Sequence, residues 1–139
     1  MKKISVLYTV FCLPAVCFCI FGLFGCRGDS GPEGRHVFID GGAHRGQTIR
    51  DFKKSGLWAD NDWLIYAFEC NPRLVQHLQE QYSERDNVKI IGKAMWIHNQ
   101  GLEFYFGKTN LGGNVVGNRY TKKSLGKIQV ESVDFGDWL

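Results

Sequence analysis

The most informative segment of this sequence is Val37-Phe38-Ile39-Asp40-Gly41-Gly42-Ala43-His44-Arg45-Gly46-Gln47-Thr48. It predicts a short apolar strand over 36–40, a turn rich in glycine, and a helix over about 46–55. Glycine lets a backbone approach a ligand closely, and the first turn of a helix offers unpaired amide groups to a carboxylate or phosphate. The segment therefore predicts a ligand-binding turn between a strand and a helix.

The elements that follow alternate between strands and helices. Trp63–Phe68 is a continuous apolar run, typical of a strand buried on both faces, and Val88–Ile91 is a third strand. Between them, Asn71 is placed to cap a helix that starts at Pro72. Its apolar face repeats every four residues, at Leu74, Leu78 and Tyr82. This order predicts an α/β domain with parallel strands and right-handed crossovers.

The pattern changes after the third strand. Leu102–Phe106 is short and aromatic and follows a turn signal, so a hairpin added to the sheet is expected. Leu111–Asn118 is rich in glycine and asparagine and predicts a loop, and Lys127–Val133 shows an imperfect strand alternation. Gly56 is expected to be the C-cap of the helix that begins near Gly46.

The acidic end of the first strand limits which ligand could bind. A phosphate-binding loop would need a lysine in the place of Gln47, and a dinucleotide fingerprint would need a different spacing of glycines. Asp40 would also repel a pyrophosphate. An acidic strand end suits a ligand with a positive amino group, so S-adenosylmethionine fits this turn better than NAD.

A second acidic residue, Glu69, follows the second strand, where a carboxylate can accept hydrogen bonds from both ribose hydroxyls. Together, Asp40 and Glu69 would flank one glycine turn. The alternative is that one of them caps a helix and the other is a surface carboxylate. The sequence favours a paired ligand site.

Three motifs give the domain a resemblance to a known family. They are Phe38-Ile39-Asp40-Gly41-Gly42-Ala43-His44-Arg45-Gly46, Ala67-Phe68-Glu69-Cys70-Asn71-Pro72 and Val133-Asp134-Phe135-Gly136-Asp137-Trp138-Leu139. In these residues the domain resembles the FkbM-type methyltransferases. The resemblance implies the Rossmann-like sheet of class I methyltransferases, incomplete here at the C-terminus because a further strand of the family should follow Leu139. It also implies S-adenosylmethionine as methyl donor and a sugar or small hydroxylated metabolite as acceptor.

The resemblance also implies roles for individual residues. The cofactor turn of the family is matched by Asp40, Gly42, Ala43, His44 and Gly46, and its ribose-binding acid by Glu69. Many class I methyltransferases carry an acidic residue for the adenine amino group after the third strand. This chain has Lys93-Ala94-Met95-Trp96 there, so packing or backbone contacts would hold the adenine.

No catalytic base is predicted. His44 is expected to orient the methionine end of the ligand, while His36, His77 and His98 are expected to face solvent, and Trp58, Trp63 and Trp96 to pack in the core. Two other functions remain open. One is a non-catalytic adenosyl-binding or scaffold module, and the other is an NAD-dependent oxidoreductase, which the glycine spacing disfavours.

The first 26 residues predict a membrane segment. No charged residue occurs between Ile4 and Cys26, a length that could span lipid as a helix of about 20 residues. An uncleaved anchor, a cleaved secretory signal and a lipoprotein signal ending at Cys26 all remain open, and the anchor is favoured. Lys2 and Lys3 place the N-terminus in the cytosol and the domain on the other side. Residues 27–35 are expected to be a solvated linker before a partial methyltransferase domain over 36–139.

Composition excludes several classes of partner. The formal net charge of the 139 residues is +3, and Lys2 and Lys3 supply two of these charges, so no nucleic-acid footprint is present. Four of the five cysteines lie in the first 26 residues and only Cys70 lies in the domain. A single domain cysteine excludes an internal disulfide, and no Cys/His spacing resembles a metal site.

Overall fold

The computed structural model describes residues 6–10, 36–59, 62–107, 113–114 and 126–139, which form a small α/β structure with three sheets. The largest sheet contains β1 (Val6–Val10), β2 (His36–Gly41), β3 (Trp63–Phe68) and β4 (Val88–Ile91), in that order. All of its neighbouring strands are parallel. The three strands predicted over the domain, and their parallel pairing, are confirmed.

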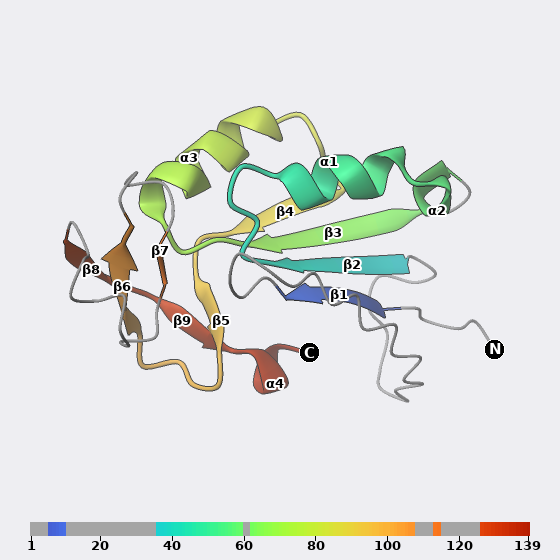
Figure 1. Cartoon of the computed structure of the whole chain (residues 1–139). Helices are drawn as coiled ribbons and strands as arrows, with labels where there is room; N and C mark the ends of the chain where they lie inside the picture. Colours follow the sequence, from blue (N-terminus) through green and yellow to red (C-terminus); the bar gives the residue numbers. More distant parts are fainter. Residues whose placement is uncertain (1–5, 11–35, 60–61, 108–112, 115–125) are drawn as a thin grey trace.

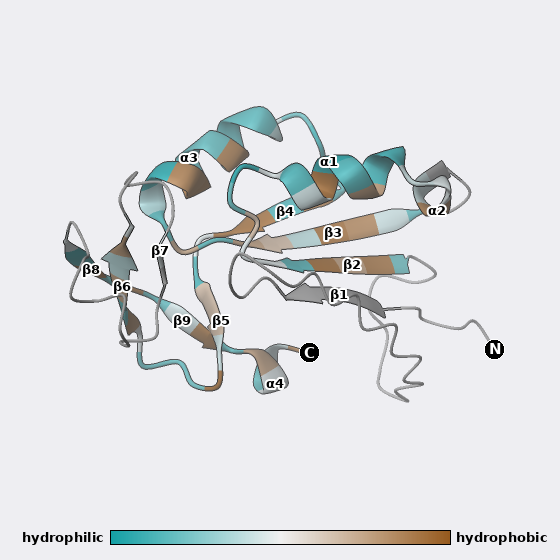
Figure 2. Cartoon of the chain, viewed as in Figure 1, coloured by the Kyte–Doolittle hydropathy of each residue, from teal (hydrophilic) through white to brown (hydrophobic). Residues whose placement is uncertain are grey.

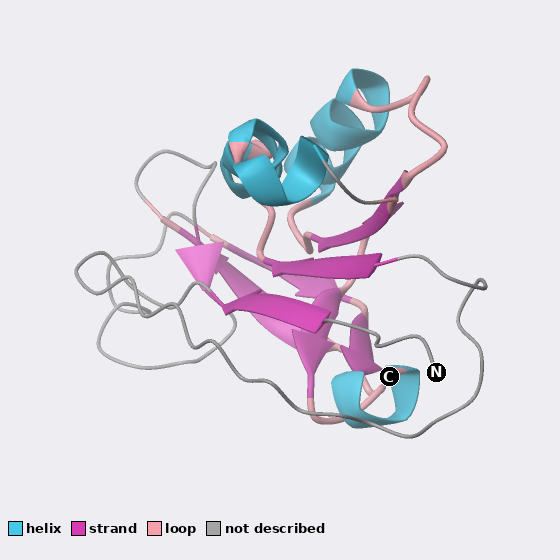
Figure 3. Ribbon diagram, turned by 90° about the vertical axis from the view of Figure 1, so that its right-hand side faces the viewer, coloured by secondary structure: helices cyan, strands magenta, loops and turns pink. Residues whose placement is uncertain are grey.

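Three helices cover one face of this sheet (Figure 1, Figure 3). They are α1 (Gln47–Lys54), α2 (Gly56–Ala59) and α3 (Pro72–Gln81). The side chain of Asn71 caps α3 by accepting the Arg73 backbone N–H at 3.2 Å, as its place before Pro72 predicts. Because α1 and α3 connect strands that advance in one direction across the sheet, right-handed crossovers place both on the same face.

The core lies between these helices and the sheet. The ring of Phe38 on β2 stacks on Phe52 of α1 at 4.1 Å between centroids, and Trp63 packs edge-on against Phe52 at 4.8 Å. All three predicted positions on α3 are buried: Leu74, Leu78 and Tyr82. Figure 2 shows hydrophobic residues along β2 and β3 and polar residues on the outer turns of α1 and α3, which is the amphipathic pattern that seats both helices.

A short C-terminal helix, α4 (Phe135–Trp138), covers the opposite face of the sheet (Figure 3). The carboxylate of Asp134 caps it by accepting the backbone N–H groups of Gly136 and Asp137 at 3.0 and 3.4 Å. The ring of Trp138 meets Tyr66 and Phe68 of β3 edge-on, at 4.9 and 5.0 Å. The closing motif of the chain is therefore a packing device, because it shields the strand that leads to Glu69.

The remaining strands form two smaller sheets. β5 (Ala94–Trp96) pairs in parallel with β9 (Ser132–Asp134). β6 (Leu102–Phe106) pairs antiparallel with β7 (Gly113–Asn114) and with β8 (Lys127–Val130). The prediction that Leu102–Phe106 extends the main sheet is wrong, because its partners belong to a separate sheet with its own core of Ala94, Phe104 and Val130.

Two further expectations need correction. Gly56 does not cap α1, because Ser55 is the C-cap, with its N–H bonded to the Phe52 carbonyl, and Gly56 begins α2. Val6–Val10 lies within the predicted membrane helix but forms a strand on β2, in a register that places Thr9 beside Asp40. No helix among the described residues is long and apolar enough to cross a membrane. The predicted segment over 11–26, the linker over 27–35 and most of the loop predicted over 111–118 lie outside the described residues.

Candidate functional site

The register of β2 and β3 brings the two predicted acids to one edge of the sheet. Asp40 pairs with Ala67 and Gly41 with Phe68, so both strands end at the same level and Glu69 follows directly. The backbone N–H groups of Gly42 and Ala43 both donate to the Phe68 carbonyl at 2.9 Å. The glycine turn is thereby fixed across the carboxyl end of β3, which is the edge where ligands bind in parallel α/β sheets.

The turn alternates between left-handed and other backbone conformations. Gly42, His44 and Gly46 have φ angles of 96°, 50° and 72°, and His44 is the one described residue other than glycine with a positive φ. Alternation of this kind turns successive N–H groups toward a common centre and creates a concavity that binds anions. No side chain caps the start of α1, so its first amide groups face the same end of the sheet.

Glu69 supplies an anion to this turn from within the protein. Its Oε2 accepts the His44 backbone N–H at 2.8 Å, and its Oε1 accepts the Asn71 backbone N–H at 2.8 Å. The side chain is buried, with 7 % of its surface exposed. Glu69 is therefore not a surface carboxylate. It links the glycine turn to the start of α3, and each oxygen keeps a second lone pair for a ligand hydroxyl.

Asp40 is enclosed more completely than Glu69. It has no exposed surface, and neither carboxylate oxygen has a hydrogen-bond partner among the described residues. Its side chain points to the helix-covered face, because side chains alternate along a strand and Phe38, two residues earlier, stacks on α1. Burial, with a smaller contribution from the nearby charge of Glu69, raises the pKa of Asp40 from 3.8 to about 7.

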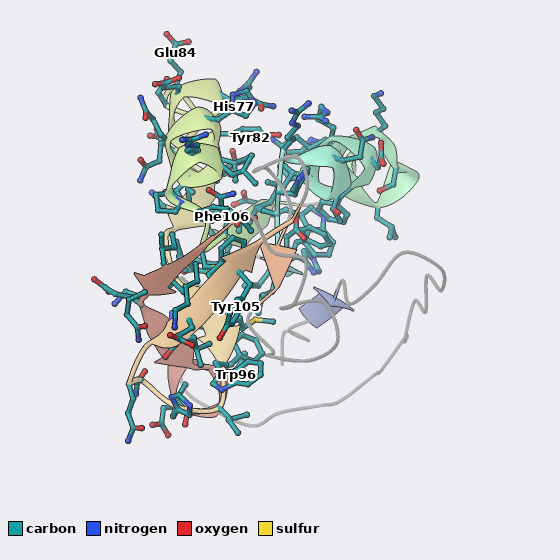
Figure 4. The ribbon with its side chains drawn as sticks, turned by 60° about the vertical axis from the view of Figure 1, so that its left-hand side comes forward. His77, Tyr82, Glu84, Trp96, Tyr105 and Phe106 are labelled. Carbon is teal, nitrogen blue, oxygen red and sulfur yellow. The ribbon has the colours of Figure 1, made fainter. Side chains whose placement is uncertain are left out.

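Tyr82 also lies near this site. The sequence analysis predicted it only as part of an apolar helix face and gave its hydroxyl no role. In Figure 4 it lies on the side of α3 that faces α1. Its hydroxyl is buried, and the nearby Arg50 guanidinium interacts with it. Burial raises the pKa of Tyr82, while the Arg50 guanidinium opposes this and the charge of Asp40 adds to it. A helical spacing of four identifies Tyr82 as a core residue but cannot show that its hydroxyl is buried and within the electrostatic influence of Asp40.

The two important glycines of the turn serve different purposes. A Cβ at Gly42 would meet nothing within 4 Å, so this position is open for a ligand to approach. A Cβ at Gly46 would lie 3.1 Å from both the Leu78 Cδ2 and the Tyr82 hydroxyl, so this glycine allows α1 to pack on α3. Ala43 is buried in the core beside them, and His44 is exposed.

The structure brings together all six predicted cofactor residues but places the other histidines elsewhere. His77 is exposed on α3, and the Nδ1 of His98 accepts the Gln100 N–H at 3.3 Å in the turn after β5. The expectation that His36 faces solvent is wrong, because its Nδ1 is buried and its ring lies 5.0 Å from that of Trp63. No described histidine other than His44 belongs to the glycine turn.

Two other features adjoin the site without joining it. Burial, with a smaller contribution from the charge of Glu69, raises the pKa of Cys70 to about 12. Its side chain packs on the smaller core of Ala94, Phe104 and Val130. A polar cavity of about 520 Å³ lies between the turn after β5 and the β8–β9 segment, beside the Lys93–Glu131 ion pair of 2.9 Å. No residue of the glycine turn lines this cavity.

Among the described residues, no group of three or more His, Cys, Asp or Glu side chains could hold a metal ion. The site consists of a hydrogen-bonded glycine turn, open space at Gly42 and two buried carboxyl groups. The carboxyl group of Glu69 is hydrogen-bonded, and that of Asp40 has no partner among the described residues. The chain matches no protein-family model, no curated protein and no solved structure.

Proposed function

We propose that this protein binds S-adenosylmethionine at the turn between β2 and α1 and transfers its methyl group to a hydroxyl of a sugar or small metabolite. One observation carries the proposal: Asp40 and Glu69 end adjacent parallel strands, and Glu69 also holds the turn through the His44 N–H at 2.8 Å. Two buried carboxyl groups beside an open glycine suit a ligand with a positive charge and a ribose diol. We also propose that the sheet of β1 to β4 is part of a Rossmann-like methyltransferase sheet.

Each residue of the turn has a role in this proposal. Glu69 accepts the ribose hydroxyls with its second lone pairs, and Gly42 leaves room for the ligand next to the backbone. The uncapped start of α1 receives the ligand carboxylate. The oxygens of Asp40, which have no hydrogen-bond partner in the described part of the chain, fit a positively charged ligand, because a buried carboxylate gains most from a nearby cation.

The reaction needs little acid–base chemistry from the protein. The ligand supplies a methyl group whose bond to sulfur breaks as the bond to the acceptor oxygen forms. Alignment of these atoms supplies most of the acceleration, and the hydroxyl proton leaves to a base or to water. The exposed side chain of His44 lies in the turn and could accept a proton there. We assign it instead to orienting the ligand.

A second function, a non-catalytic adenosyl-binding module, is favoured by a specific observation. Of the described histidines, His36 packs on Trp63, His77 is exposed on α3, and His98 lies in the turn after β5. Apart from His44, none is placed at the turn to accept the acceptor proton. The two functions share the cofactor site and differ only in turnover.

Calorimetric titration of the full chain in detergent tests the proposal, with S-adenosylmethionine and NAD as separate ligands. We expect micromolar binding of S-adenosylmethionine alone, weakened at least tenfold by Glu69→Ala. Glu84→Ala removes an exposed carboxylate and is the matched control. Equal binding by the Glu69 variant, or preferential binding of NAD, would contradict the site.

We also propose that residues 1–26 attach the protein to a membrane, with the domain on the non-cytosolic side. Residues 6–10 pair with β2 in the structure, so a spanning helix over 1–26 requires these residues to leave the sheet. A non-cytosolic domain would also require S-adenosylmethionine to be imported. Protease digestion of intact cells that carry a C-terminal tag tests the orientation. A tag that lies in the cytosol, where added protease does not reach it, would contradict the proposed non-cytosolic domain.

A further inference from the structure

The buried carboxyl of Asp40 differs from every other acidic group around it. Glu69 has two backbone N–H partners, and Asp51 on α1 accepts the Gln47 amide at 2.8 and 2.9 Å. Asp40 has no hydrogen-bond partner among the described residues and no exposed surface. A carboxylate in these conditions lacks both solvent and donors, so its neutral, protonated form is favoured.

The groups that face Asp40 strengthen this preference. Glu69, after β3, places a second carboxylate nearby and opposes a negative charge on Asp40. Tyr82, the C-cap of α3, contributes a buried hydroxyl, and the guanidinium of Arg50 on α1 lies near that hydroxyl. The guanidinium of Arg50 is held by the Arg45 carbonyl at 2.6 Å and the Gln47 side chain at 2.8 Å, so it is not paired with Asp40.

We propose that Asp40 makes the site selective for charge, because it holds a proton in the empty site and releases that proton when a sulfonium ligand binds. The inference rests on the proposed function and adds a specificity-determining role to it. The balance is simple: the carboxyl O–H bond breaks, the proton passes to solvent, and the carboxylate remains opposite the ligand cation. The demethylated product keeps its ammonium group but has a neutral thioether in place of the sulfonium. In this proposal the charge opposite Asp40 is the one on sulfur, so the product releases no proton and is bound less well.

The same exchange favours release of the product. Once the methyl group has left, the positive charge on sulfur is gone and the buried carboxylate has lost its counter-charge. Asp40 then takes a proton back from solvent, so the product has no ionic contact with Asp40 and is bound less tightly than the sulfonium ligand. The preference for the charged ligand must therefore weaken in acid, where Asp40 remains protonated even when the ligand arrives.

The first measurement reads the proton without any ligand. Carbon NMR of labelled aspartate carboxyl groups in the full chain, assigned with Asp40→Asn, should give Asp40 a titration midpoint near pH 7. Glu69→Gln should lower that midpoint because it removes the neighbouring charge, and exposed Asp51→Asn should leave it unchanged. A midpoint below pH 5 would overturn the inference.

The second measurement reads the coupling. Calorimetry at pH 7 in buffers of different ionisation enthalpy should show about half a proton released with S-adenosylmethionine and none with S-adenosylhomocysteine. The ratio of the two affinities should rise about tenfold between pH 6 and pH 8, and Asp40→Asn should abolish both effects. Tight binding of S-adenosylmethionine without proton release would overturn the inference about Asp40 but not the proposed function. A chain that binds neither ligand overturns the proposed function, and the charge selection with it.

Discussion

The carboxylate of Glu69 accepts the backbone N–H of His44 across 25 positions of sequence, at a distance of 2.8 Å. Its other oxygen accepts the N–H of Asn71, the residue that caps α3. One buried side chain thus fixes both the ligand turn and the start of the next helix. Any change at Glu69 should therefore affect stability as well as ligand binding.

Glu69→Gln should lower the free energy of unfolding by about 1–3 kcal/mol, because the amide can replace only one of the two acceptor oxygens. Urea denaturation near pH 5.5 is the suitable measurement, since Asp40 is then mostly protonated and the relief of its repulsion adds little. Exposed Glu84→Gln should change stability by less than about 0.5 kcal/mol. Equal stability of both variants would show that the two backbone contacts of Glu69 contribute nothing.

Asp40→Asn should alter how stability depends on pH. The pKa of Asp40 is about 7 in the folded protein against 3.8 for an unperturbed group, so between these values the folded state binds more protons. Ionisation of Asp40 therefore lowers the stability of the wild-type protein as the pH rises from about 4 to 7, and the effect levels off above pH 7.

The asparagine variant cannot ionise and should gain about 2.5 kcal/mol relative to the wild type between pH 5 and pH 8. Urea unfolding at unit intervals of pH checks this difference. Asp51→Asn, an exposed change of the same charge, should run parallel to the wild type. A parallel curve for Asp40→Asn as well would mean that Asp40 is ionised in the fold.

Alanine at the two turn glycines should separate strain from packing. Gly46→Ala combines a φ of 72° with a Cβ at 3.1 Å from Leu78 and Tyr82, so a loss of about 2–4 kcal/mol is expected. Gly42→Ala has a φ of 96° but open space, so about 1–2 kcal/mol is expected.

Ligand affinity should show the opposite order. Gly42→Ala should weaken S-adenosylmethionine more than Gly46→Ala does, because only the Gly42 position is open toward a ligand. Thermal unfolding and calorimetry on the same samples give both quantities. Equal losses of affinity would remove the distinction between an approach glycine and a packing glycine.

Trp138→Ala should destabilise the protein by about 1–2 kcal/mol, because its half-buried ring covers Tyr66 and Phe68 on the face of β3 away from α1. Asp134→Ala should cost about 1 kcal/mol through loss of the α4 cap. The neighbouring Leu139 is 64 % exposed, so Leu139→Ala is the matched control and should be nearly neutral. Chemical denaturation of the three variants ranks these contributions, and a neutral Trp138→Ala would mean that α4 does not shield the sheet.

Local signals were sufficient for β2, β3, β4, α1 and α3, but not for β1 or α2. The apolar run Trp63–Phe68, the Asn71–Pro72 start of α3 and the spacing of Leu74 and Leu78 each depend on neighbours within a few residues, and the structure confirms them. Short elements with ambiguous patterns were missed, among them β5 and α4. Pairing partners far away in sequence determine such elements, and periodicity does not record those partners.

The sequence by itself determined that an acidic residue would follow each of two adjacent buried strands, and that glycines would turn the first strand into a helix. Tertiary structure alone decided that Glu69 would be hydrogen-bonded and that Asp40 would have no partner among the described residues, because hydrogen bonding and burial depend on which distant groups converge. It also decided that Val6–Val10 lies on β2 and that Leu102–Phe106 joins a separate sheet. Apolar segments of similar composition can enter lipid or a sheet edge, and only the competing partners settle which.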